Sequence, residues 1–165
     1  MIRLIPLDDP FLENLLNDPE GGLRKLASNA VEVCEYFEPL LRQAREAQRQ
    51  VPSHAPWISY LAHESGGDRL VGICSFEGDP NRSGEVEISY GTVPKYEGRG
   101  FATEMARAML AIAFAEPEVQ RVIAHTLPVP NAPTRVLHRV GMKKTGDRTD
   151  PEEGRMWRWE IERPA

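Results

Sequence analysis

A short glycine turn is the part of this sequence with the clearest chemical meaning. The stretch "EGRGFATE" covers residues 97–104 and sets Gly98 and Gly100 one residue apart, directly before a long helix-forming run. Glycine lets backbone N–H groups come close to a ligand, and the N-terminus of a helix attracts anions. The turn is therefore expected to hold a phosphate group, unless it is an ordinary connection between a strand and a helix.

Two familiar phosphate-binding motifs do not fit this turn. A nucleoside-triphosphate loop needs Lys and then Ser or Thr after its second glycine, whereas Phe101 and Ala102 follow Gly100 here. The dinucleotide motif places a third glycine or alanine where this chain has Thr103, and it follows the first strand of a domain. The remaining interpretation is a pyrophosphate held by backbone N–H groups, with Arg99 adding a cation and Thr103 a hydroxyl.

Carboxylates lie on the strand that leads into the turn. In "EVEISYGTV", at residues 85–93, polar and apolar residues alternate, which places Glu85 and Glu87 on one face. A carboxylate beside a bound ligand can take a proton from an amine. The alternative is that both glutamates belong to a solvated strand face.

The elements that position these residues alternate between strands and helices. Period-two alternation predicts the strands, and apolar residues at three and four spacing predict the helices. In chain order they are a strand at 2–7, a helical region at 10–50 broken at "NDPEGG" and Pro39, a hairpin at 57–64 and 70–78, a strand at 85–93, a helix at 102–116, a strand at 119–127, a helix at 132–141 and a strand at 155–163. The order predicts one mixed α/β domain over residues 1–165.

The composition excludes several classes of protein. A net charge of -5 argues against a nucleic-acid-binding surface. No apolar run is long enough for a membrane span and no signal peptide is recognised, so we expect a cytoplasmic protein without a membrane partner. Cys34 and Cys74 lack metal-type spacing, and "HE" at 63–64 lacks a second histidine, so no metal site is expected.

The segment "EVEISYGTVPKYEGRGFATEMARAML" resembles the acetyl-CoA-binding segment of the GCN5-related N-acetyltransferase (GNAT) superfamily. It is most similar to the branch that acetylates the N-termini of ribosomal proteins. Gly100 and Ala102 match the superfamily pattern, whereas Glu97 stands where it has Gln or Arg. The later "NAPTRVLHRVGM" resembles the family's Asn-x-x-Ser helix, with either Asn131 or Pro130 in the Asn position. The resemblance covers about residues 57–161.

This resemblance implies a single central, mostly antiparallel sheet flanked by helices, the acyl-CoA N-acyltransferase fold, with acetyl-CoA as co-substrate and no metal. The cofactor-binding residues that it implies are Thr92, Val93, Gly98, Arg99, Gly100, Phe101, Ala102, Thr103 and Asn131. The backbone at Thr92 and Val93 would pair with the pantetheine arm, and the Val93 N–H would polarise the thioester carbonyl. Glu87 is the expected general base. His138, on the later helix, is either a general acid or a surface residue.

The implied activity is transfer of an acetyl group to a primary amine by direct attack in a ternary complex, because neither cysteine is placed to carry an acyl group. The first alternative is a non-catalytic acyl-CoA-binding or sensor domain with the same fold. The second is an interaction module whose glycine turn binds nothing. The acceptor amine is a small molecule or a peptide, and Tyr36, Phe37 and Trp57 either line its pocket or pack in the core. The family also suggests a homodimer.

Overall fold

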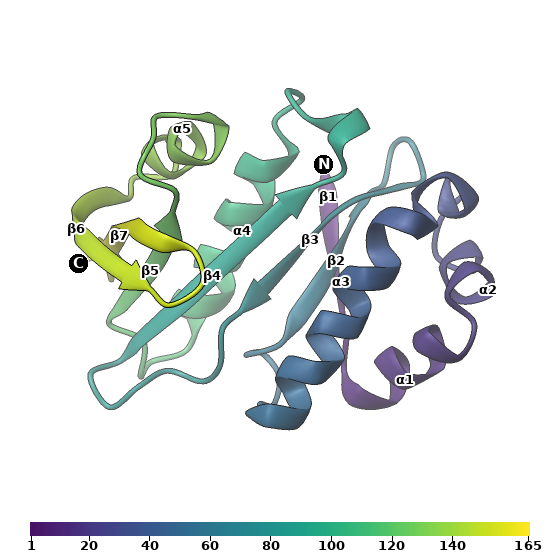
Figure 1. The fold of residues 1–165 in the computed structure, drawn as a ribbon, viewed down its shortest axis with the longest axis horizontal. Helices are drawn as coiled ribbons and strands as arrows, with labels where there is room; N and C mark the ends of the chain where they lie inside the picture. Colours follow the sequence, from purple (N-terminus) through teal and green to yellow (C-terminus); the bar gives the residue numbers. More distant parts are fainter.

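The computed structural model describes residues 1–165 and contains one seven-stranded sheet with helices on both faces (Figure 1). The strands are β1 (Ile2–Pro6), β2 (Ser59–Glu64), β3 (Arg69–Phe76), β4 (Glu85–Thr92), β5 (Arg121–Thr126), β6 (Lys143–Asp150) and β7 (Gly154–Glu162). The helices are α1 (Asp9–Asn17), α2 (Pro19–Arg24), α3 (Ala30–Gln50), α4 (Phe101–Ala115) and α5 (Ala132–Arg139), with a 3-10 turn η1 (Pro94–Tyr96). The mixed α/β fold class expected from the sequence is confirmed.

The strands lie in the order β1-β2-β3-β4-β5-β7-β6. All neighbours are antiparallel except β4 and β5, which are parallel. These two strands pair at three positions, and the last joins Glu87 to Ile123. Beyond Glu87, β4 continues to pair with β3 while β5 pairs with β7 alone. A gap therefore opens between the carboxyl-terminal halves of β4 and β5.

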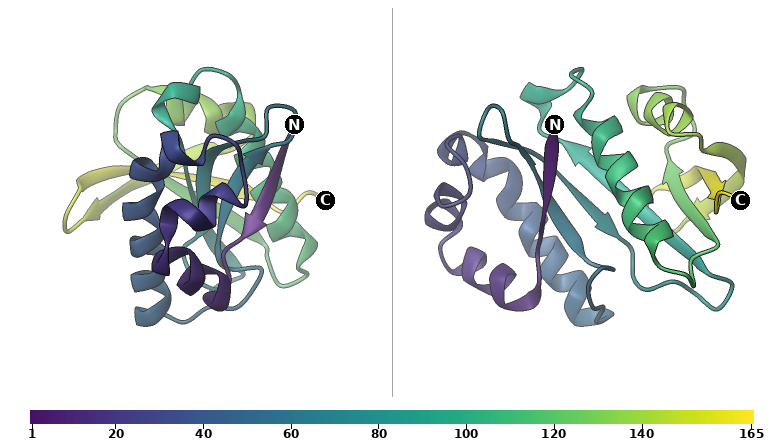
Figure 2. Two further views of the ribbon diagram at one scale, coloured as in Figure 1. Left: turned by 90° about the vertical axis from the view of Figure 1, so that its right-hand side faces the viewer. Right: turned by 180° about the vertical axis from the view of Figure 1, so that it is seen from behind.

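The helices cover the two faces of the sheet unequally. Helices α1, α2 and α3 lie over one face of β1–β4, and α4 covers the opposite face (Figures 1 and 2). Helix α5 lies beside α4. The hairpin of β6 and β7 projects on the same side as α3 (Figure 2, left), so β4 forms the floor between α3 and this hairpin. No helix has the length and apolar character that a membrane crossing needs.

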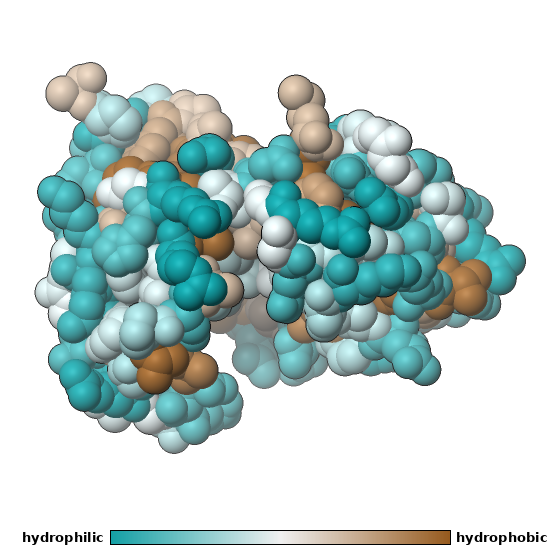
Figure 3. Space-filling model, turned by 90° about the horizontal axis from the view of Figure 1, so that it is seen from above, coloured by the Kyte–Doolittle hydropathy of each residue, from teal (hydrophilic) through white to brown (hydrophobic).

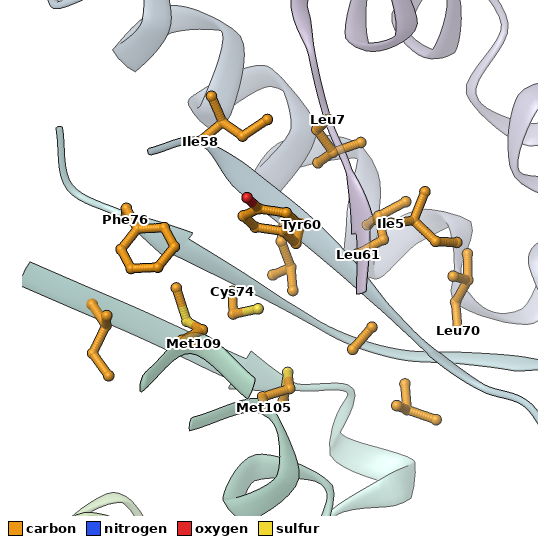
Figure 4. Close-up of a cluster of buried hydrophobic side chains, with 14 of the residues drawn as sticks. Ile5, Leu7, Ile58, Tyr60, Leu61, Leu70, Cys74, Phe76, Met105 and Met109 are labelled. Atoms are coloured by element: carbon orange, nitrogen blue, oxygen red, sulfur yellow. The ribbon is translucent and has the colours of Figure 1, made fainter. Parts of the chain in front are cut away.

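Part of the core lies between α4 and β3. Met105 and Met109 of α4 are fully buried and face Cys74 and Phe76 of β3 (Figure 4). Burying each of these methionine side chains contributes about 1.5–3 kcal/mol. Gly72 makes the close approach feasible, since a Cβ there would lie 2.8 Å from Met105 Cε and 2.5 Å from a β4 carbonyl oxygen. The packing fixes α4, and with it the glycine turn, against the sheet.

Helix α3 passes through Pro39, where the sequence predicts a break. Proline removes the N–H that would donate to the carbonyl of Glu35 and costs a helix interior about 3 kcal/mol. The flanking Phe37 and Leu41 are completely buried. Their packing offsets the lost hydrogen bond, so the predicted break is wrong.

Strand β6 is absent from the sequence prediction. Its sequence "KKTGDRTD" shows no apolar alternation, and almost all of its residues are exposed. It is an edge strand that pairs with β7 alone. Charged side chains are common on edge strands because they discourage pairing with another chain, and this removes the pattern by which strands are predicted.

Candidate active site

The glycine turn opens into a cleft of about 460 Å³ between β4, the start of α4 and α5. We call it the glycine cleft, and it is lined by Tyr90, Gly91, Thr92, Tyr96, Glu97, Gly98, Gly100, Phe101, Ala102, Thr103, Ala132, Pro133, Arg135, Val136 and Arg139. Seen from above, the surface is hollowed between the two halves of the molecule, with hydrophobic residues inside the hollow (Figure 3). Most of the predicted cofactor residues therefore lie around one space.

The turn leaves a row of backbone donors without acceptors. Gly98 and Gly100 have φ angles of 76° and 87°, in the left-handed region that favours glycine. No group in the protein accepts a hydrogen bond from the N–H groups of residues 98–103, and Glu104 is the first whose N–H finds an acceptor, the carbonyl of Gly100 at 3.1 Å. Unpaired N–H groups at a helix N-terminus attract an anion.

Polar and charged side chains lie beside these unpaired N–H groups. Thr103 is 6% exposed and lines the cleft, and its buried Oγ1 has no hydrogen-bond partner. Arg135 and Arg139 of α5 line the opposite wall. The sequence prediction did not include these two arginines, although their spacing of four residues places them on one helix face. Glu97 adds a single carboxylate to the lining.

The backbone of β4 offers hydrogen-bonding groups to the gap. Val93 donates its N–H to the carbonyl of Val71 on β3 at 2.8 Å. In an antiparallel ladder successive residues direct their backbone groups to alternate sides, so those of Tyr90 and Thr92 face the gap. The expected role of the Val93 N–H in polarising a thioester is therefore wrong, because that N–H is already bonded to β3.

Besides Val93, two predicted cofactor residues, Arg99 and Asn131, lie outside the lining of the glycine cleft. The guanidinium of Arg99 lies over the ring of Tyr96, 5.4 Å from its centroid. Asn131 is the N-cap of α5: its Oδ1 accepts from the Thr134 N–H at 3.3 Å, and its own N–H donates to Thr134 Oγ1 at 2.9 Å. This reciprocal capping box orients the helix that carries Arg135.

His138 is not brought to the cleft. Its ring packs edge-on against Trp159 with 4.9 Å between centroids, and its side chain is exposed on the other face of α5. A general acid must lie within hydrogen-bond reach of the leaving group. The observed position of His138 matches its interpretation as a surface residue.

A second hollow, of about 310 Å³, lies between α3 and the sheet. We call it the serine groove, and it is lined by Tyr36, Leu40, Gln43, Ala44, Ala47, Ser59, Ile73, Ser75, Phe76, Glu77, Ser89, Tyr90 and Gly91. Its floor is a row of serines paired in register across three strands, Ser59 with Ser75 and Ser75 with Ser89. The groove shares Tyr90 and Gly91 with the glycine cleft. The two spaces therefore meet at the gap beside β4.

The serine groove carries one charged residue, Glu77, which accepts a hydrogen bond from Ser89 Oγ at 2.6 Å. No sequence motif points to Glu77. Of the three aromatic residues expected near an acceptor, Tyr36 lines the groove, whereas Phe37 and Trp57 are buried in the core. Burial raises the pKa of Tyr36, and the nearby Glu97 carboxylate raises it further.

Glu87 and Glu85 share a face of β4 but have different surroundings. Glu85 is held by two arginines, Arg121 at 3.1 Å and Arg158 at 2.9 Å, and its side chain is 15% exposed. Glu87 lines neither the glycine cleft nor the serine groove, but it stands on β4 two residues before Ser89 of the groove, and its Oε2 lies 3.0 Å from Nδ1 of His125. Its side chain is 25% exposed. Glu87 is thus the more accessible carboxylate of the two.

Solved structures share this architecture. The aminoglycoside acetyltransferase AAC(6')-Ib in complex with coenzyme A superposes with a TM-score of 0.65, 17% identity and coverage of 99% of this chain and 95% of that chain. The fold is that of the GNAT acyltransferases. Residues 1–143 match the model of the acetyltransferase (GNAT) domain. The chain therefore belongs to the GNAT acetyltransferase family, and it is an acyltransferase.

Curated relatives agree with this assignment. The uncharacterized N-acetyltransferase YjdG of Bacillus subtilis is 22% identical over 132 residues, which cover 74% of each protein. The uncharacterized N-acetyltransferase YnaD of the same organism is 35% identical over 60 residues. That alignment covers 36% of this chain and 35% of YnaD.

Proposed function

We propose that this protein transfers the acetyl group of acetyl-CoA to a primary amine by direct attack in a ternary complex. The pyrophosphate of acetyl-CoA would bind at the glycine turn, the pantetheine arm would lie along the gap beside β4, and the amine would enter the serine groove. The observation that carries the proposal is the row of unpaired N–H groups at residues 98–103 beside the unpartnered hydroxyl of Thr103. Phosphate oxygens would supply the acceptors that these donors lack.

The chemistry requires a neutral amine, because a protonated amine has no lone pair. Glu87 is the proposed general base, taking the proton directly or through water. The amine nitrogen then attacks the thioester carbonyl carbon, the amide C–N bond forms, the C–S bond breaks, and the thiolate of CoA takes up a proton. The backbone N–H of Tyr90 or Thr92 is the proposed donor to the carbonyl oxygen as negative charge develops on it.

The states of the two cysteines favour direct transfer over an acyl-enzyme. Burial raises the pKa of the Cys74 thiol to about 12. Burial also raises the pKa of Cys34, and nearby carboxylates raise it further. The thiolate is the nucleophilic form of cysteine, so neither residue is suited to accept an acetyl group at neutral pH.

The acceptor is proposed to be a primary amine without a carboxylate or phosphate beside it. Glu77 is the charged residue of the serine groove, and neither Arg nor Lys lines this groove. An anionic acceptor would meet a carboxylate without a compensating cation. Aminoglycosides, alkyl diamines and the peptide N-termini of ribosomal proteins all fall within this class.

The first test measures the thermal stability of the protein with acetyl-CoA, NAD or ATP at equal concentrations. Acetyl-CoA alone is expected to raise the Tm, since a ligand at hundredfold excess over its Kd stabilises the folded state by about 2.7 kcal/mol. Thr103→Val is expected to weaken acetyl-CoA binding about tenfold, because it removes a hydrogen bond to a charged group. Thr149→Val, at an exposed position of β6, is the matched control. An unchanged Tm with acetyl-CoA would contradict the proposal.

The second part of the test follows release of the CoA thiol with a panel of acceptors. The panel contains 1,5-diaminopentane, benzylamine, a short peptide with N-terminal alanine, and glutamate. We expect release with at least one of the first three and the slowest release with glutamate. Binding of acetyl-CoA without transfer to any amine would disprove the catalytic part of the proposal.

A further inference from the structure

We propose that His125 is a positioning residue for the transfer reaction and holds the Glu87 carboxylate in the orientation in which it receives the proton of the acceptor amine. This inference rests on the proposed function and adds a residue that the mechanism above does not use. His125 lies on β5, across the gap from the strand that carries Glu87. No motif in the sequence connects the two residues.

The contact between the two side chains is direct. His125 Nδ1 lies 3.0 Å from Glu87 Oε2. Glu87 and Ile123 form the last pair between β4 and β5, so His125, two residues after Ile123, lies on the same face at the start of the gap. A carboxylate accepts hydrogen bonds and does not donate them. In this contact Nδ1 is therefore the donor and the Glu87 carboxylate the acceptor.

Burial separates the roles of the two residues. The His125 side chain is 6% exposed, whereas that of Glu87 is 25% exposed. Nε2 of His125 is buried and has no hydrogen-bond partner. An acceptor amine, or a water that carries its proton, can thus contact the Glu87 carboxylate and cannot contact His125. His125 must act through Glu87.

The other charged groups around His125 hold Glu87 less firmly. Arg148 of β6 lies 3.8 Å from Glu87 Oε1, and its side chain is half exposed. Arg158, opposite His125 on β7, is bound by two glutamates of its own. The Asp150 carboxylate accepts N–H groups of the β6–β7 turn. The hydrogen bond from His125 is the shortest polar contact of the Glu87 carboxylate and comes from a buried, rigid strand position.

The hydrogen bond restricts the Glu87 carboxylate in a specific way. It occupies a lone pair of Oε2 and fixes the plane of the group. Oε1, which is 3.8 Å from the half-exposed Arg148 guanidinium and has no hydrogen bond, is left as the oxygen proposed to accept the proton. A long, partly exposed Glu side chain without such a partner would spread over several rotamers, and proton transfer depends on the geometry of the base.

The experiment compares His125→Asn, His125→Gln and His125→Leu. The Asn amide places an N–H donor close to the position of Nδ1, whereas the Gln amide places it close to Nε2. Release of the CoA thiol is measured with the amine of the panel above that reacts fastest and, separately, with hydroxylamine. Hydroxylamine is mostly unprotonated at neutral pH, so its acetylation does not need a general base.

With the alkyl or peptide amine, His125→Gln and His125→Leu are expected to lower kcat by about 10- to 100-fold, a part of the range of general-base catalysis. His125→Asn is expected to keep kcat within about threefold of the wild type, because the donor to Glu87 is retained. The KM for acetyl-CoA and the rate with hydroxylamine are expected to be unchanged in all three variants. A loss of folding would lower both rates together.

His63 provides a matched control. It is also a buried histidine bonded to a carboxylate: its Nε2 lies 2.9 Å from Asp68 Oδ1, and its side chain is 7% exposed. It lines neither the glycine cleft nor the serine groove. His63→Leu is expected to keep the ratio of the amine rate to the hydroxylamine rate. A lower ratio in His63→Leu, equal to that in His125→Leu, would show a general effect of packing and would overturn the proposal.

The remaining outcomes separate the positioning role of His125 from the proposed function. Equal kcat values in all His125 variants, or the same loss in His125→Asn and His125→Gln, would overturn the positioning role and leave the proposed function intact. No thiol release by the wild type with any acceptor would overturn the proposed function and, with it, this inference. The imidazole ¹⁵N spectrum tests the contact without an acceptor: the Nδ1–H tautomer is expected for His125, and the Nε2–H tautomer would contradict the proposal.

Discussion

Glu97 is the residue of the glycine cleft whose charge opposes the proposed ligand. Its carboxylate lines the same space as the unpaired N–H groups of residues 98–103. At an exposed site, two like charges a few ångströms apart repel by about 1 kcal/mol. Glu97→Gln is therefore expected to tighten acetyl-CoA binding about fivefold, and the gain should shrink at high salt.

Isothermal titration calorimetry at low and high salt measures this effect. Glu35→Gln is the matched control, because Glu35 is exposed on α3 and lines neither cleft. Weaker binding by Glu97→Gln would show that the carboxylate itself contacts the ligand. That result would change the orientation proposed for the pyrophosphate.

The residues that the sequence could predict are those that lie next to one another in the chain. Gly98, Gly100 and Thr103 form one turn, so their shared role is visible in the sequence, and all three line the cleft. Glu77 and His125 become meaningful through neighbours that the fold brings from other strands. A sequence pattern cannot show such neighbours.

Asn131 shows at the scale of an element how a family position can be read in two ways. The resemblance implies a contact with the cofactor, whereas the observed hydrogen bonds make this side chain the cap of α5. Replacing a cap residue with alanine costs about 1 kcal/mol, and Asp caps a helix as well as Asn does. Asn131→Ala is expected to lower the free energy of unfolding by about this amount, and Asn131→Asp to leave it nearly unchanged.

Urea denaturation measures both variants, and calorimetry measures their affinity for acetyl-CoA. Asn131→Asp is expected to keep the affinity within about twofold of the wild type, because the capping bond survives. A large loss of affinity in this stable variant would restore the side-chain amide as a cofactor contact.

The predicted elements were correct where burial and periodicity agree. In β4, Val86 and Ile88 are buried on one face and Glu87 is accessible on the other, as the alternation predicts. The prediction failed at β6, whose charged edge has no apolar face, and at Pro39, where packing outweighs a lost helix bond. Local sequence carries little information about either effect, because both depend on what packs alongside.

At the scale of the whole molecule, the positions of the cysteines test the order of events in the reaction. Direct transfer needs no thiol, and the raised pKa values leave both Cys34 and Cys74 mostly protonated at neutral pH. Treatment with iodoacetamide at neutral pH is therefore expected to leave thiol release unchanged. Double-reciprocal plots against the two substrates should intersect; parallel lines and loss of activity on alkylation would point to an acyl-enzyme.

The whole fold is predictable to the level of a mixed sheet with helices on both faces, because the order of elements restricts the topology. The order of the strands in the sheet cannot be predicted from the sequence. Placing β7 between β5 and β6 requires β6, which the sequence does not reveal. The gap beside β4 depends on where β5 stops pairing, and no residue type marks Glu87 as the last paired position.

The sheet is joined at its centre by three residue pairs between β4 and β5. A pantetheine arm in the gap would bridge the two halves of the sheet with hydrogen bonds that the free protein lacks. Bound acetyl-CoA would therefore stabilise the folded sheet as well as supply the acetyl group. The free protein would open between β4 and β5 more often than the protein bound to acetyl-CoA, and proteases act on opened states. The lifetime of the enzyme in a cell would then rise and fall with the supply of its own substrate.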